Sequence, residues 1–72
     1  MWHYMSAVGM LRIVKFPDGV FYFQFRDNDM CWTGHRNPQS VASDVYGHVT
    51  GCPDWDASDA NCPESIADWL PG

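Results

Sequence analysis

Apolar and polar residues alternate on both sides of Pro17-Asp18-Gly19, and this pattern predicts a β-hairpin over residues 10–27. Proline and aspartate suit the corners of a type I turn, and glycine accepts the left-handed conformation of the bulge that follows. A three-residue loop fixes the register, so Phe16 should oppose Val20. The pairs further out should then be Lys15–Phe21, Val14–Tyr22, Ile13–Phe23, Arg12–Gln24 and Leu11–Phe25.

This register sorts the hairpin side chains onto two faces, because successive residues of a strand point to opposite sides. One face is almost entirely apolar and should line the core: Leu11, Ile13, Phe21, Phe23 and Phe25, with Lys15 near the turn. The other face is mixed, and it is either solvated or a contact surface: Arg12, Val14, Phe16, Val20, Tyr22, Gln24 and Arg26.

A third strand over residues 30–33 and a helix over residues 38–46 are expected to follow the hairpin. Asn37 can cap the helix, and Pro38 is tolerated at its first position. Gly47 should end the helix in a left-handed conformation. An apolar stripe with helical spacing would cover the phenylalanines of the hairpin: Val41, Ala42, Val45 and Val49.

The rest of the chain is less regular. Residues 50–61 read as a polar loop held by Trp55, and residues 63–70 as a second short helix that starts at a proline. Residues 1–9 are expected to form a loose tail, because a start at Met5 or Met10 would leave them out. The sequence therefore predicts a single small α+β domain over residues 1–72, with an antiparallel sheet packed against one or two short helices.

Charge is distributed unevenly along the chain. It has a net charge of −5, and all four Lys and Arg residues lie within residues 1–36. A nucleic-acid-binding protein normally presents a basic face, so we expect no contact with DNA or RNA. The acidic half, with Asp54, Asp56 and Asp59, either keeps the protein soluble or meets a basic partner. As a third interpretation, it imitates nucleic acid as an inhibitor.

Compartment and oligomeric state follow from general features. The N-terminus lacks a signal-peptide pattern, and no apolar run has the length of a membrane span, so we expect a cytoplasmic protein without membrane contact. Three cysteines, an odd number, also suit a reducing compartment. A homodimer is a reasonable expectation for a short chain with 15% aromatic residues.

The strongest motif for a metal is Cys31-x3-His35-x12-His48-x3-Cys52. Two ligand pairs about a dozen residues apart are typical of structural zinc sites, and the order resembles that of CHHC zinc fingers. However, Gly47 and Gly51 interrupt the helix that His48 and Cys52 would have to share. The sequence therefore favours a fold without metal or other cofactor, and a zinc-stapled binding module is the alternative.

Other candidate chemistry is weaker. Cys52 and Cys62 either form a disulfide across the polar loop or remain free thiols. The run Asp54-x-Asp56-x-Ser58 begins like a calcium loop, but it lacks the glycine and the bidentate glutamate of such loops. A catalytic cysteine would pair Cys31 with His35 or His48, yet no nucleophile signature surrounds it.

These observations favour a non-catalytic module that binds an unidentified protein partner. Two surfaces are candidates for the contact. The first is the mixed hairpin face, with Arg12, Tyr22, Gln24 and Arg26 as its binding residues. The second is the acidic half, with Asp54, Asp56 and Asp59.

Overall fold

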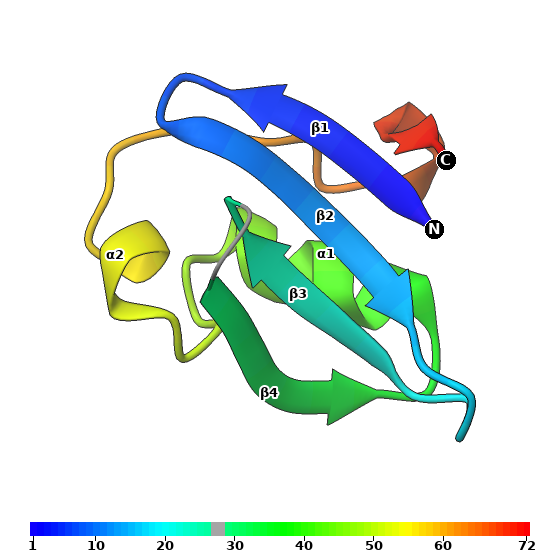
Figure 1. The fold of residues 1–72 in the computed structure, drawn as a ribbon. Coiled ribbons are helices and arrows are strands. Elements are labelled where there is room, and N and C mark those ends of the chain that lie inside the picture. The colour runs from blue at the N-terminus through cyan, green and yellow to red at the C-terminus, as the bar shows by residue number, and fades with distance from the viewer. Residues whose placement is uncertain (27–28) are drawn as a thin grey trace.

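The computed structural model describes residues 1–26 and 29–72. Within them, five antiparallel strands form one sheet in the order β4-β3-β2-β1-β5, and helix α1 packs behind it (Figure 1). The elements are β1 (Trp2–Ser6), β2 (Gly9–Lys15), β3 (Phe21–Phe25), β4 (Asp29–His35), α1 (Pro38–Tyr46), α2 (Pro53–Asp56), a single 3-10 turn (Ile66–Asp68) and β5 (Leu70–Pro71). The α+β fold class predicted from the sequence is confirmed.

The predicted hairpin forms with the predicted register, from Lys15 opposite Phe21 to Leu11 opposite Phe25. Phe16 N–H donates to the Val20 carbonyl at 2.9 Å, which closes the three-residue loop. Gly19 has a φ of 84°, the left-handed conformation that the bulge requires. Asp27, the last residue of the predicted hairpin, lies outside the described residues.

The third strand is confirmed and is longer than predicted. Strand β4 pairs with β3, and its register shifts between the Phe23–Cys31 pair and the Phe21–His35 pair. Such an irregularity bends the strand and changes its twist. Gly34 is needed at this bend, because a Cβ there would lie 2.4 Å from Cγ1 of Val20.

Helix α1 has the bounds that the sequence predicts. The Asn37 side chain accepts a hydrogen bond from Ser40 N–H at 2.8 Å, as expected of a cap. The helix buries Val41, Ala42 and Val45 against the sheet, whereas Val49 lies beyond the helix end and is exposed. Gly47 ends the helix as expected, but its predicted left-handed conformation is wrong. It keeps a right-handed φ of −82°, and the left-handed residue is His48.

The structure differs from the sequence-based expectations at both ends of the chain. Residues 1–9 do not form a loose tail, because β1 pairs along its length with β2, from Trp2–Ile13 to Ser6–Gly9. Its alternation buries Ser6 and packs Trp2 and Tyr4 against the core. A tight turn supports this hairpin, since Ser6 Oγ accepts from Val8 N–H and donates to the Gly9 carbonyl.

The predicted helix over residues 63–70 is also wrong. Only the 3-10 turn at Ile66–Asp68 forms, and the Leu70–Pro71 strand then pairs with β1. Trp69 explains the difference. It has extended backbone dihedrals and is buried, and its indole N–H donates to the Pro63 carbonyl at 3.0 Å. The extended backbone at Trp69 ends the 3-10 turn and leads into β5.

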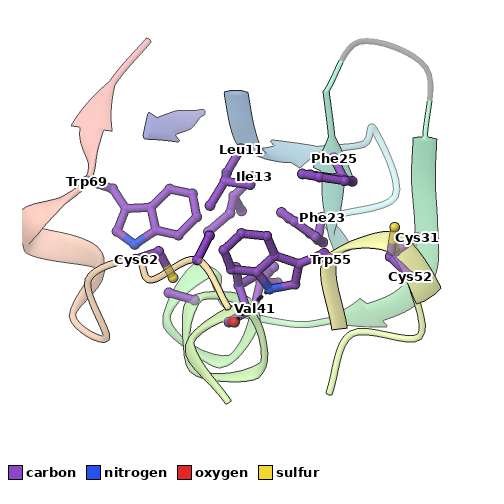
Figure 2. Close-up of a cluster of buried hydrophobic side chains, with 13 residues drawn as sticks. Leu11, Ile13, Phe23, Phe25, Cys31, Val41, Cys52, Trp55, Cys62 and Trp69 are labelled. Carbon is purple, nitrogen blue, oxygen red and sulfur yellow. Dashed lines mark hydrogen bonds between the residues drawn. The ribbon is translucent and has the colours of Figure 1, made fainter. Parts of the chain in front are cut away.

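Trp55 lies in the middle of the core, between the sheet and α1 (Figure 2). Its side chain is fully buried, and its indole N–H donates to the Val45 carbonyl at 2.8 Å. The ring meets Phe23 and Phe25 at centroid distances of 6.2 and 5.8 Å. The polar loop predicted over residues 50–61 is thus held by Trp55 as expected, and it contains the one-turn helix α2.

Candidate functional site

The outer face of the sheet, opposite α1, is the surface that the structure leaves open for a partner. Figure 1 shows no helix over this face in the described part of the chain. Strand pairing places one cross-strand row on it: Met30, Gln24, Arg12, His3 and Leu70. Leu70 is 58% exposed. The outer face therefore mixes apolar, amide and basic groups, as the alternation of the hairpin predicts.

Three aromatic residues gather on this face next to the hairpin turn. Phe16, Tyr22 and Trp32, here called the aromatic cluster, meet edge to face at centroid distances of 4.9, 5.6 and 5.2 Å. Edge-to-face pairs are favourable by about 0.5–1.5 kcal/mol beyond their buried area, so the three rings hold one another in place. Trp32 is nevertheless 64% exposed. A large, oriented aromatic side chain is thus presented to solvent.

The structure brings together three of the four binding residues proposed on the hairpin. Arg12, Tyr22 and Gln24 lie on the outer face. Arg26 does not, because it follows β3 with a φ of 58° and turns toward the β1–β2 hairpin. Its Nε donates to the Val8 carbonyl at 3.1 Å, and its guanidinium lies 4.8 Å from the centroid of the Phe25 ring. Arg26 therefore has a structural role.

The acidic candidates do not act as one group. Asp56 accepts hydrogen bonds from the Thr50 N–H and hydroxyl and from Gly51 N–H, at 2.8–3.0 Å. Its carboxylate thus shapes the loop before α2. Asp54 and Asp59 are exposed. In the calcium-like run, the Asp56 carboxylate is therefore already occupied by hydrogen bonds within the fold.

The four residues of the zinc motif do not converge. In an extended strand, residues four apart are separated by roughly 13 Å, so β4 cannot direct both Cys31 and His35 to one ion. His35 Nε2 instead bonds Asp44 Oδ2 at 2.6 Å. Among the described residues, no three His, Cys, Asp or Glu side chains are grouped so as to hold a metal.

His48 has a different role from the one its spacing suggested. Its ring stacks on Trp55 at a centroid distance of 4.7 Å, and both of its nitrogens face carbonyl oxygens at 2.9 Å, those of Trp55 and Ala60. His48 therefore ties α2 to the following segment and is not directed toward Cys31.

Cys31 and Cys52 do come together. Cys31 lies on β4 and Cys52 precedes α2, and Figure 2 shows these two buried side chains together at one end of the core. Burial raises the pKa of the Cys31 thiol to about 12, and the hydrogen bond and charge of Cys52 add to the rise. Both thiols reach an open pocket of about 350 Å³, the thiol pocket, lined by Met30, Cys31, Trp32, Gly51, Cys52, Pro53 and Asp54.

Of the two possibilities left open for Cys52 and Cys62, the structure shows free thiols, and all three cysteines are free and buried. Figure 2 shows Cys62 at the opposite end of the core from Cys31 and Cys52. Burial raises the pKa of the Cys62 thiol to about 11. The zinc motif grouped Cys31 and Cys52 with two histidines, and the structure brings only the two cysteines together, because His35 pairs with Asp44 and His48 stacks on Trp55.

Comparison with known proteins adds no assignment. No protein-family model, curated protein or solved structure matches this chain. Within residues 1–26 and 29–72, none of the helices is both long and apolar enough to span a bilayer. The candidate sites are therefore the outer face with its aromatic cluster and the thiol pocket.

Proposed function

We propose that this protein is a small, non-catalytic binding module that recognises another protein through the aromatic cluster on its outer face. The observation that carries the proposal is Trp32, which is held by Phe16 and Tyr22 and is still 64% exposed. Trp and Tyr dominate the energetics of protein interfaces, since a rigid ring contributes a large contact area at little entropic cost.

The position of the cluster supports an extended peptide segment as the bound element. Trp32 lies on β4, which is an edge strand with a strand neighbour on one side. An extended segment can lie along such an edge and place an apolar side chain on the rings. The cluster thus combines an anchor for side chains with backbone groups that can guide a chain.

The area available argues for a segment of a different protein over a second copy. A stable interface of standard size buries about 800 Å² per partner, which is about a fifth of the 4134 Å² accessible surface of this chain. A fully buried aromatic side chain contributes about 150–250 Å², and the three rings already cover one another in part. The cluster is therefore an anchor of peptide size.

The remaining interpretations have less support. A zinc-stapled module would require its four candidate ligands to converge, but they lie apart among the described residues. An inhibitor that imitates nucleic acid would require carboxylates that face a partner, whereas the Asp56 carboxylate is hydrogen-bonded within the fold. We propose that the protein acts in the cytoplasm, and its three free, buried thiols support a reducing compartment.

The test is comparative capture from a lysate of the source cells, followed by titration of the captured protein. Wild type, Trp32→Ala and Tyr46→Ala are immobilised at equal density. Tyr46 is the matched control, because it is also a half-exposed aromatic residue but lies at the end of α1. Truncating a central tryptophan costs about 2 kcal/mol or more, which is roughly 30-fold in Kd.

The expected result is a protein captured by wild type and Tyr46→Ala and lost with Trp32→Ala. Circular dichroism confirms that each variant is folded. Equal capture by all three variants would overturn the proposal, and loss of binding in Asp54→Asn with Asp59→Asn instead would assign the contact to the acidic half. A second copy of the chain as the captured species would contradict a heterologous partner.

A further inference from the structure

We propose that Cys31 and Cys52 form a redox-sensitive pair, which small oxidants entering the thiol pocket convert to an intrachain disulfide. Cys31 and Cys52 come from separate elements, and both line the open thiol pocket of about 350 Å³. The side chains lie together at one end of the core in Figure 2. This inference is independent of the proposed binding function.

The loop that carries Cys52 is fixed by its own hydrogen bonds. The Asp56 carboxylate holds Thr50 and Gly51, and Thr50 Oγ accepts from Cys52 N–H at 3.1 Å. Gly51 adopts a φ of 84°, which turns the chain so that Cys52 faces β4. Cys52 is therefore held opposite Cys31 before any oxidation takes place.

Access distinguishes this pair from the third cysteine. Cys31 and Cys52 are 7% and 5% exposed, and both line the thiol pocket. Its volume lies in the range of sites that admit small molecules. Cys62 is equally buried but lies at the other end of the core, so it serves as an internal control.

The chemistry proceeds in two exchange steps with a low-molecular-weight disulfide, RSSR, as the oxidant. Burial raises the pKa of the Cys31 thiol to about 12, which makes Cys31 a poor first nucleophile, so we assign the first attack to Cys52 and the second, intramolecular attack to Cys31, whose proton leaves with the second RS group. Cys52 sulfur displaces one RS group, which leaves as RSH with the Cys52 proton. Cys31 sulfur then attacks Cys52 and releases the second RSH. The sum is two thiols and RSSR giving one protein disulfide and two RSH.

The disulfide would tie the edge strand β4 to the loop before α2. It closes a loop that contains all of α1, and such a constraint acts mainly on the unfolded chain. For a domain of this size, the closure is expected to raise Tm by roughly 10 °C or more. The oxidised protein should therefore be the more stable form.

The experiment treats the intact protein with oxidised glutathione and follows intact mass, peptide maps and Tm. The wild type should lose the mass of two hydrogen atoms, yield a crosslinked Cys31–Cys52 peptide and gain stability, and dithiothreitol should reverse all three changes. Cys62→Ser should behave like the wild type. Cys31→Ser should lose the crosslink and the Tm gain, and Cys52→Ser should do the same.

Several outcomes would overturn the proposal. One is a crosslink that includes Cys62, and another is oxidation that only joins separate molecules. A third is a wild type that stops at glutathione on Cys52 without resolution by Cys31. If Cys31→Ser does not fold, Cys31→Ala keeps the test valid, because the site is apolar and buried.

Discussion

Replacing Trp55 by phenylalanine tests the centre of the core, because a single phenyl ring takes the place of the two-ring indole. The variant loses the indole N–H that donates to the Val45 carbonyl at 2.8 Å, a bond with a net contribution of about 1 kcal/mol. The smaller ring also leaves part of a fully buried site unfilled, at a cost of about 1–2 kcal/mol. We expect a total loss of about 2–3 kcal/mol.

This loss is large for so short a chain. At about 0.05–0.15 kcal/mol per residue, a chain of 72 residues has a stability of roughly 4–11 kcal/mol. A cost of 2–3 kcal/mol should lower Tm by about 10–20 °C. Urea unfolding followed by far-UV circular dichroism measures the change without depending on tryptophan fluorescence.

Trp32→Phe is the matched control, since the same substitution is made at a side chain that is 64% exposed. It should cost less than about 0.5 kcal/mol, as is usual for surface positions. If Trp55→Phe melts within a few degrees of the wild type, or if both substitutions cost the same, the core as described here is wrong.

Three further substitutions test single features of the fold. Gly34→Ala should lower stability by about 1–3 kcal/mol and disturb the aromatic cluster, because the new Cβ would lie 2.4 Å from a methyl group of Val20. Gly47→Ala is the control, since its Cβ would meet only ordinary contacts, and thermal melts compare the two variants. Asn37→Ala should lower stability by about 1 kcal/mol through loss of the helix cap, and an unchanged urea midpoint would contradict the cap. The raised pKa of Cys62, about 11, means that the unfolded chain loses this proton first, so stability should fall as pH rises above about 9, and less steeply in Cys62→Ser. Melts at pH 8 and pH 10.5 check this sign.

The elements that were predictable are those specified by neighbouring residues. The turn at Pro17–Gly19 fixes its register within the loop itself, and the cap at Asn37 sets the start of α1 three residues later. Both signals involve residues only a few positions apart in the sequence. The two-face sorting of the hairpin then followed without further information, and it placed Tyr22 on the outer face.

The elements that were missed depend on distant partners. The N-terminal residues form a strand whose Trp2 and Tyr4 side chains pack against the core. The conformation of the last residues depends on the burial of the Trp69 ring. Neither outcome follows from local propensity, which tertiary packing overrides. The register shift in β4 belongs to the same class, since it depends on the fit of Gly34 against Val20.

The two candidate sites also differ in whether local sequence or distant contacts specify them. Successive residues of a strand point to opposite faces, so β4 directs Trp32 outward and Cys31 inward. Alternation placed Tyr22 on the outer face, whereas its contact with Trp32 is visible only in the structure. The inward partner of Cys31 could not be derived, because Cys52 reaches it only through a loop that the Asp56 carboxylate holds. One short edge strand thus carries the aromatic cluster proposed to bind a partner, on the face set by local alternation, and one member of a thiol pair that depends on tertiary structure.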